Sequence, residues 1–404
     1  MERAEREKLP LFGIRVLEFT HAVMGPTTGL LLADMGAEVI HIEPTDGDPT
    51  RKLKGFGTGY FYFYNRNKKS LAIDLKSEQG KKIIYELASE CDVLVENFGP
   101  GTMDKLGFSF EKIKSIHPGI IYCSLKGFLS GPYEHRIAMD EVVQMMGGLA
   151  YMTGRSGDPL RAGTSIVDIT GGMFGYIGIL LSLIEKQKTG QGRYVKSALF
   201  ETTAFLMGQH MVYSALSESR IPPMPERISA WSIYNIFDTL DSQKIFIGII
   251  SEKQWTKFCT IFRKEEWLND PRFGTNNLRI DHKEELLPQV VEIIKSFPMS
   301  GLVAMLEKAG IPFAPIAHPE DLFTDPHLNA NGSLVDTCLE NQVKAPLPIF
   351  PLQWGEQRTD TWNDAPAIGE HTYEILLRAG FSPVELESYE KEGIIVKTIK
   401  TDHS

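Results

Sequence analysis

The amino-acid sequence predicts an α/β protein with a parallel sheet. Residues 14–43 contain a β-branched run, a Gly-Pro turn that leads into an apolar helix, and a second strand ending at Glu43. This strand–helix–strand order is the unit from which parallel sheets are built. The alternation continues with a strand in 70–76, a helix from Glu78 to Ser89, a strand in 92–101 and a buried strand in 119–128.

The length of the chain predicts two domains, because 404 residues are more than one hydrophobic core usually serves. The polar, proline-rich stretch 218–228 is typical of a linker, and 233–249 alternates like a hairpin. We therefore expect a large domain in 1–224, a smaller domain in 225–335, and a C-terminal segment, 336–404, with short strands and a helix.

Composition and charge narrow the class of protein. The net charge of −10 argues against nucleic acid as the main partner. The N-terminus lacks the apolar core of a signal peptide, and we expect no membrane span because polar or charged residues interrupt every long apolar run. The four cysteines form no CxxC pair, and no histidine has a ligand-like partner at close spacing, so neither disulfides nor a metal site are expected. These features predict a soluble cytoplasmic protein.

Two stretches near the N-terminus raise the question of a nucleotide or phosphate ligand. Glu43 ends its strand as the ribose-binding acid of dinucleotide-binding folds does, but the preceding THAVMGPTTG is not a GxGxxG fingerprint, so no nicotinamide cofactor is expected. The basic turn 64–70, with Lys68 and Lys69 and nearby Lys76, is either a solvated loop or a phosphate clamp.

The stretch RAGTSIVDITGG, residues 161–172, precedes a long apolar helix and places Asp168 near its N-terminus. Asp168 is either the N-cap, which the local sequence favours, or a nucleophile. Ser165 and Thr164 are alternative caps, and position 171 lacks the Glu or Gln of a capping box. If Asp168 is a nucleophile, the neighbouring glycines would let a bulky ligand approach closely: Gly163, Gly171 and Gly172.

The chain resembles the class III CoA-transferases along nearly its whole length. The resemblance rests on VLEFTHAVMGP, DMGAEVIHIEP, NRNKKSLAIDLK, DVLVENFGPGTMDKLGF, SLKGFLSGPY, GTSIVDITGGMFG and C-terminal AGIPFAPIAHPEDLFTDPHL. Over the first 200 residues it is most similar to the formyl-CoA:oxalate branch. The resemblance implies a Rossmann-like large domain built from both ends of the chain, a small domain between them, and two subunits interlocked as rings in a homodimer.

The resemblance also identifies Asp168 with the family's catalytic aspartate. Its carboxylate would attack an acyl-CoA thioester to give a mixed anhydride, then an aspartyl-CoA thioester from which an incoming acid takes the CoA. Because aspartate normally ionises well below neutral pH, we expect no general base to be needed. Coenzyme A enters as part of the substrate, and no metal is implied.

Further positions correspond to family residues that line the CoA site: Ile73, Lys76, Asn97, Phe98, Lys105 and Leu106. A phosphate-binding arginine of the oxalate branch falls on Pro44, for which Arg51 is a possible substitute. Val23 and Met139 replace an active-site glutamine and tyrosine, and the small-domain glycine flap is absent. With Met24 they predict a more apolar pocket, suited to a C4–C5 dicarboxylate or a branched or aromatic acid.

Two alternative functions stay open at this point. An acyl-CoA racemase on the same fold is disfavoured because Met139 stands where racemases carry a histidine base, and a thioether takes no proton. A non-catalytic acyl-CoA-binding relative is disfavoured by the intact Asp168 motif.

Overall fold

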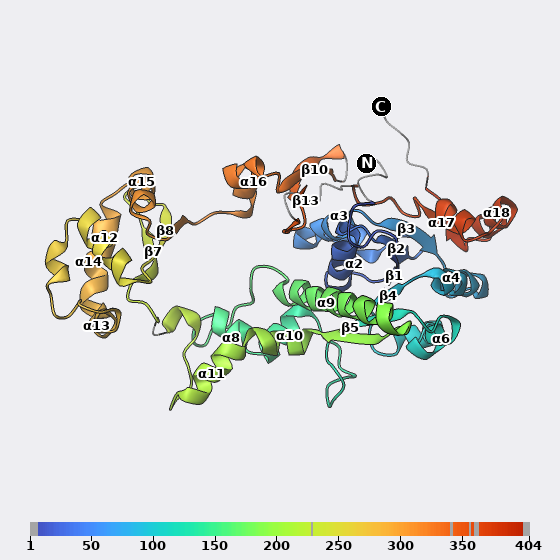
Figure 1. Cartoon of the computed structure of the whole chain (residues 1–404), viewed down its shortest axis with the longest axis horizontal. Coiled ribbons are helices and arrows are strands. Elements are labelled where there is room, and N and C mark those ends of the chain that lie inside the picture. The colour runs from blue at the N-terminus through green and yellow to red at the C-terminus, as the bar shows by residue number, and fades with distance from the viewer. Residues whose placement is uncertain (1–6, 228, 340–341, 355–356, 359–362, 399–404) are drawn as a thin grey trace. The chain divides into compact units, whose positions relative to one another are not determined.

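The computed structural model describes residues 7–227, 229–339, 342–354, 357–358 and 363–398. The chain divides into two compact units (Figure 1): a larger unit of Met1–Pro225 and His327–Ser404, and a smaller unit of Glu226–Pro326. The first boundary lies inside the proline-rich stretch 218–228. Residues 327–335, which we assigned to the smaller domain, belong to the larger unit.

A seven-stranded sheet forms the centre of the larger unit, with the order β14-β3-β2-β1-β4-β5-β6. All neighbouring strands are parallel except β14, which runs antiparallel to β3. The α/β class with a parallel-dominated sheet is therefore confirmed. The strands are β1 (Arg15–Phe19), β2 (Glu38–Glu43), β3 (Lys69–Ile73), β4 (Val93–Glu96), β5 (Ile121–Lys126), β6 (Tyr194–Ala198) and β14 (Ile395–Val396).

The strand order reverses at β1, because the chain moves outward through β2 and β3 and then crosses to β4 on the other side. In open α/β sheets, ligands bind beyond the carboxyl ends of the strands at such a point. The loops that follow β1 and β4 diverge here. The topology alone thus locates a candidate site next to residues 20–24 and 97–100.

Helices cover both faces of the sheet because alternate strand residues point to opposite sides. Leu17 faces one apolar cluster, which it shares with α4 (Glu78–Glu90), α6 (Phe110–Ile116), α17 (Thr372–Arg378) and α18 (Pro383–Lys391). Val16 faces the other cluster, which it shares with α2 (Met24–Asp34), α7 (Asp140–Met146), α9 (Ile166–Thr189) and α10 (Leu199–Leu206).

The helix α9 is long and apolar enough to cross a membrane, with a mean hydropathy of 1.7 over its most apolar window. No charged residue lies between Asp168 and Glu185, although the polar residues Thr170 and Ser182 interrupt this stretch. In the fold, α9 packs closely on α2. A Cβ at Gly172 would lie 2.5 Å from the Met24 carbonyl oxygen, and Thr28 Oγ1 donates to the Gly172 carbonyl at 2.9 Å.

The smaller unit combines an antiparallel sheet with helices. The sheet has the order β7-β8-β9 and contains the hairpin expected over 233–249. Its elements are β7 (Tyr234–Asp238), β8 (Lys244–Gly248), α12 (Glu252–Ile261), α13 (Asn276–Asp281), α14 (Lys283–Lys295), α15 (Met299–Ala309) and β9 (Phe313–Pro315).

Shorter elements complete the part of the chain that the structure describes. They are α3 (Tyr60–Tyr64), α5 (Thr102–Leu106), α8 (Leu149–Thr153), α11 (Gly208–Leu216), α16 (Pro326–Ala330), β10 (Leu334–Cys338), β11 (Lys344–Pro348), β12 (Gln353–Trp354), β13 (Gln357–Arg358) and five 3-10 helices, η1 (Pro49–Lys52), η2 (Gly55–Gly59), η3 (Met224–Glu226), η4 (Glu265–Leu268) and η5 (Pro319–Thr324).

Candidate active site

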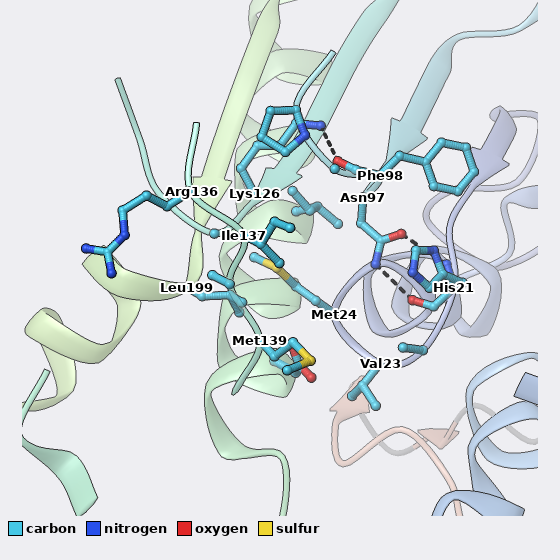
Figure 2. Close-up of a pocket in the computed structure, with 17 residues that line it drawn as sticks. His21, Val23, Met24, Asn97, Phe98, Lys126, Arg136, Ile137, Met139 and Leu199 are labelled. Carbon is cyan, nitrogen blue, oxygen red and sulfur yellow. Dashed lines mark hydrogen bonds between the residues drawn. The ribbon is translucent and has the colours of Figure 1, made fainter. Parts of the chain in front are cut away.

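A cavity of about 300 Å³ opens at the carboxyl ends of β1, β4 and β5 (Figure 2). The loop after β1 supplies one wall and the loop after β4 another, as the strand order predicts. Segment 136–139, before α7, and the start of α9 close the remaining sides. The lining residues are His21, Ala22, Val23, Met24, Asn97, Phe98, Gly99, Pro100, Leu125, Lys126, Gly127, Arg136, Ile137, Ala138, Met139, Asp168 and Leu199.

Asp168 lies in the first turn of α9 but does not cap it. The N-cap position is Ser165, whose side chain makes no capping hydrogen bond. The cap comes from Asp140 instead, whose Oδ2 accepts from the backbone N–H of Val167 at 2.9 Å and of Asp168 at 3.1 Å. The interpretation of Asp168 as the N-cap is therefore wrong. Among the described residues, the Asp168 carboxylate has no hydrogen-bond partner, and it lines the cavity.

The environment of Asp168 disfavours its charge. Burial, followed by the nearby carboxylates of Asp140 and Glu141, raises its pKa from 3.8 to about 7, against the opposite effect of Arg161. Our expectation that Asp168 ionises well below neutral pH is therefore wrong. At pH 7 the free protein holds Asp168 partly protonated.

Two of the glycines near Asp168, Gly171 and Gly172, serve packing and not ligand access. A Cβ at Gly171 would lie 2.7 Å from the Met24 side chain, and Gly172 lies against the α2 backbone. Gly163 is exposed and has no neighbour within 4 Å of a built Cβ. Gly171 and Gly172 thus seat α9 on α2, whose Met24 lines the same cavity as Asp168.

The turn between β1 and α2 is held by Asn97. Its Oδ1 accepts from the His21 N–H at 3.0 Å, and its Nδ2 donates to the His21 carbonyl at 2.8 Å (Figure 2). The next residue, Ala22, has φ of +64°, a region that residues with a Cβ adopt at a cost and that recurs at functional sites. The Asn97 side chain therefore positions this turn.

The loop after β4 is fixed by a buried pair. Lys126 Nζ lies 2.7 Å from the Glu96 carboxylate and donates to the Phe98 carbonyl at 2.8 Å. The Phe98 ring stacks on His21, with ring centroids 5.7 Å apart. Desolvation lowers the pKa of His21, which favours its neutral imidazole. Arg136 points away from the cavity (Figure 2).

Six of the predicted site residues line this one cavity: Asp168, Val23, Met24, Met139, Asn97 and Phe98. The other four do not. Ile73 is fully buried in the core, Leu106 packs against that core, and Lys76 and Lys105 are exposed. Sequence reasoning missed His21, Lys126, Arg136 and Leu199. Two of them could have been predicted from their position, because His21 and Lys126 stand at the carboxyl ends of β1 and β5.

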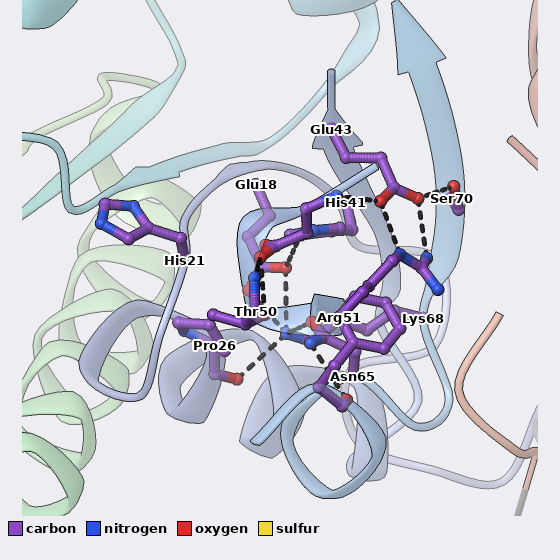
Figure 3. A network of polar contacts seen from close by, with 12 residues as sticks. Glu18, His21, Pro26, His41, Glu43, Thr50, Arg51, Asn65, Lys68 and Ser70 are labelled. Carbon is purple, nitrogen blue, oxygen red and sulfur yellow. Dashed lines mark hydrogen bonds and ion pairs between the residues drawn. The ribbon is translucent and has the colours of Figure 1, made fainter. Parts of the chain in front are cut away.

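A buried polar network lies against α2 (Figure 3). Lys68 Nζ donates to both Glu18 oxygens at 2.9 Å, to the Pro26 carbonyl at 3.0 Å and to Asn65 Oδ1 at 3.0 Å. His41 lies between Glu18, at 3.0 Å, and Asp48, at 3.2 Å. Burial opposes the imidazolium charge, yet the hydrogen bonds to Asp48 and Glu18 raise the pKa of His41 to about 9.

This network overturns both interpretations for Lys68 and Lys69. Lys68 is fully buried, and Lys69 pairs with Glu38 and Glu374. Neither lysine is solvated or free for a phosphate. Arg51 is also engaged, because its Nε and Nη2 donate to the Glu43 carboxylate at 2.9 and 2.8 Å. Its role as a substitute for the family arginine that falls on Pro44 stays a prediction.

Comparison with known proteins agrees with this geometry. Residues 11–372 match the model of CoA-transferase family III. The chain belongs to this family. It is 31% identical to the human succinyl-CoA:glutarate CoA-transferase over 91% of the chain and 85% of that protein. It is 32% identical to the formyl-CoA:oxalate CoA-transferase of Rhodopseudomonas palustris over 95% and 97% of the two chains.

The family assignment extends to solved structures. The crystal structure of a CAIB/BAIF family protein from Brucella suis superimposes with a TM-score of 0.79 at 30% identity, covering 92% of this chain and 99% of that one. The chain is accordingly an enzyme of the CoA-transferase family, which uses CoA thioesters as substrates. Among the described residues, no group of three or more His, Cys, Asp or Glu side chains is placed to hold a metal ion.

Proposed function

We propose that this transferase moves CoA from an acyl-CoA donor to a free carboxylic acid through covalent intermediates on Asp168. The observation that carries the proposal is the Asp168 carboxylate. It lines the cavity at the carboxyl ends of β1, β4 and β5 and has no hydrogen-bond partner among the described residues. The other two carboxylates that raise the pKa of Asp168 already have partners: Asp140 caps α9, and Glu141 pairs with Arg161. Asp168 is the group left available for chemistry.

The reaction runs through four balanced steps. The Asp168 carboxylate attacks the thioester carbonyl, the C–S bond breaks, and CoA leaves as a thiolate with a mixed anhydride behind it. The thiolate attacks the aspartyl carbonyl, releasing the donor acid and forming an aspartyl-CoA thioester. The acceptor carboxylate attacks this thioester and expels the thiolate again. The thiolate then attacks the acceptor's acyl carbonyl, which yields the new acyl-CoA and restores the Asp168 carboxylate.

The proposed donor is of the formyl-, oxalyl- or succinyl-CoA type, and a C4–C5 dicarboxylic acid is the acceptor we favour. The apolar side chains of Val23, Met24 and Met139 support the larger acid, since they provide surface for methylene groups and no hydrogen bonds for oxalate. The name of the human relative, a succinyl-CoA:glutarate CoA-transferase, supports the same choice.

We further propose that CoA extends from the cavity along the loop that holds Asn97 and Phe98 toward Lys76 and Lys105. These two lysines are exposed and free to meet phosphates as point charges. The side chain of Ile73 lies in the core, so a contact there would be made by its backbone. Lys76→Ala should raise the KM for acyl-CoA several-fold with little effect on kcat; an unchanged KM removes Lys76 from the site.

The decisive experiment is intact-protein mass spectrometry after incubation with a panel of acyl-CoAs, followed by hydroxylamine. Wild-type protein should gain a CoA adduct that hydroxylamine converts to a hydroxamate at Asp168, whereas Asp168→Asn should gain neither. The donors that react define the acyl group. An adduct on both proteins would assign the nucleophile elsewhere, and none on either, with acyl-CoA bound, would favour a non-catalytic relative.

The racemase alternative now depends on His21, the neutral imidazole in the same cavity. A racemase would exchange the α-proton of a 2-methylacyl-CoA with deuterated water in the absence of any acceptor acid. We expect no such exchange, because Met139 occupies the position of the family's histidine base. Exchange that is lost in His21→Ala would replace the transferase proposal.

We also propose that the chain acts in the cytoplasm as the interlocked homodimer of its family. An exposed apolar row along α9 supports the dimer: Met173, Ile177, Leu181 and Ile184. Leu181→Glu should prevent assembly in size-exclusion chromatography with light scattering. Val384→Glu, a matched change at an exposed residue of α18, should leave the mass unchanged. A monomeric wild type would contradict the proposal.

A further inference from the structure

We propose that Asp140 is the positioning residue of this active site: it caps α9 from outside the helix and thereby leaves the Asp168 carboxylate free to face the cavity. The inference deepens the proposed function and rests on Asp168 as the nucleophile. It is drawn from four hydrogen bonds: two join α7 to the start of α9, one joins α7 to the segment before α9, and one lies within α7.

The contacts of Asp140 are buried and complete. Its side chain is only 3% exposed. Oδ2 accepts from the N–H groups of Val167 and Asp168, and Oδ1 accepts from Gln144 Nε2. Gln144 in turn accepts from the Ala162 N–H through Oε1 at 2.9 Å. One turn of α7 therefore holds both the segment before α9 and the first turn of α9 itself.

This arrangement controls where the Asp168 side chain turns. With Ser165 as the N-cap, Asp168 is the third residue of the helix, from which a carboxylate reaches back to unpaired N–H groups at the helix start. Asp140 already occupies two of these donors. Because two of the donors are taken, the Asp168 carboxylate has less to gain from folding back onto its own helix, and it lines the cavity.

The charge of Asp140 acts on Asp168 as well. Four side chains from the surrounding elements influence the charge of Asp168 or respond to it: Asp140, Glu141, Arg161 and Tyr64. After burial, Asp140 is the largest contributor to the raised pKa of Asp168. A carboxylate with a pKa near neutral is a more basic nucleophile than an ordinary aspartate and is still substantially ionised at working pH. Asp140 thus supplies the orientation and adds to the basicity that burial gives.

Two variants and a control separate the two effects. Asp140→Ala removes the cap and the charge. Asp140→Asn removes the charge but keeps an amide oxygen, and asparagine is as good a cap as aspartate. Glu141→Gln removes a neighbouring charge from the exposed side of α7 without touching the α9 backbone. Circular dichroism and melting first establish that each variant is folded.

The first readout is hydrogen–deuterium exchange of peptides that cover 162–170, which requires no activity. In Asp140→Ala the amides of Val167 and Asp168 should exchange at least about tenfold faster than in wild type, since a charge-assisted bond is lost. Asp140→Asn should lie between the two, and Glu141→Gln should match wild type. Unchanged exchange in Asp140→Ala overturns the cap.

The second readout is the pH dependence of aspartyl-CoA adduct formation. The wild-type rate should fall tenfold per unit below a pH near the Asp168 pKa of about 7. For Asp140→Asn this limb should move to lower pH by roughly one unit, and its plateau rate should fall because the nucleophile is less basic. Asp140→Ala should lose about tenfold or more of the plateau rate.

The possible failures are distinguishable. Faster exchange in Asp140→Ala with wild-type rates and pH profiles in both Asp140 variants would make the cap purely structural and overturn the positioning role. A wild-type protein that forms no adduct with any donor overturns the proposed function and with it the catalytic part of this proposal. In that case the exchange data still decide whether Asp140 holds α9.

Discussion

Replacing Asp168 with asparagine removes a carboxylate that the fold holds in an unfavourable environment, so we expect the variant to be more stable than wild type above neutral pH. The folded-state pKa is about 7, against about 3.9 in an unfolded chain. Because folding raises this pKa, the ionised side chain costs stability. The cost is absent well below pH 3.9, grows as the pH rises and is complete above about 7.

The size of the effect follows from the pKa difference. A gap of about three units at 1.36 kcal/mol per unit corresponds to about 4 kcal/mol. Asp168 is only half-buried and faces the cavity, so solvent screening reduces the expected gain to about 2 kcal/mol. For a unit of about 300 residues, this gain raises the melting temperature by roughly 3 °C.

Differential scanning calorimetry at pH 8 and pH 4 tests the reasoning. Asp168→Asn should melt above wild type at pH 8, and most of the difference should vanish at pH 4, where the wild-type carboxylate is protonated. Asp46→Asn, at a side chain that is 80% exposed, should change the melting temperature little at either pH. Equal stability of Asp168→Asn and wild type at pH 8, or a gain that persists at pH 4, would refute the raised pKa.

Three further predictions concern the support of α2 and α9. Lys68→Met leaves buried Glu18 without its ammonium partner and should cost about 3 kcal/mol in urea unfolding, whereas Lys69→Met, at a part-exposed pair, should cost less than about 1 kcal/mol; equal costs would contradict the network. Gly172→Ala should lower both stability and kcat, because its Cβ would lie 2.5 Å from a backbone oxygen of α2. Wild-type values in both measurements would show that the site does not depend on this packing. The pKa of His41 is raised to about 9, so its contribution to stability is present below pH 6.5 and should be lost as the pH rises through 9. His41→Gln should flatten this decline in unfolding measured between pH 7 and 10, and an identical pH dependence would argue against a buried imidazolium.

Much of the fold could be predicted because it depends on local pattern. The β-branched runs and the helices between them appear in the sequence in the order in which the sheet is built. The hairpin over 233–249 was predicted for the same reason. The antiparallel pairing of β14 with β3 could not be predicted, because it joins residues more than 300 positions apart and the run Ile395–Val396 is too short to show a period.

The site was only partly predictable, for a different physical reason. Asp168, Asn97 and Met139 carry motif signals, but a motif does not show which groups surround it. Lys68 looked like a surface charge because its local sequence is basic, and its partner Glu18 lies 50 residues away on β1. Asp140 is likewise distant in sequence, 28 residues from Asp168, yet its carboxylate accepts a hydrogen bond from the Asp168 N–H.

The position of Asp168 also shows why a helix N-terminus does not always favour a negative charge. The unpaired N–H groups of a first turn normally stabilise a carboxylate and lower its pKa. Here two of these groups donate to Asp140, so the favourable end of the α9 dipole stabilises that side chain. Asp168, one step farther into the cavity, receives the repulsion of Asp140 without the hydrogen bonds. The two aspartates at this helix end therefore have different roles: Asp140 caps the helix, and Asp168, whose pKa is raised, lines the cavity.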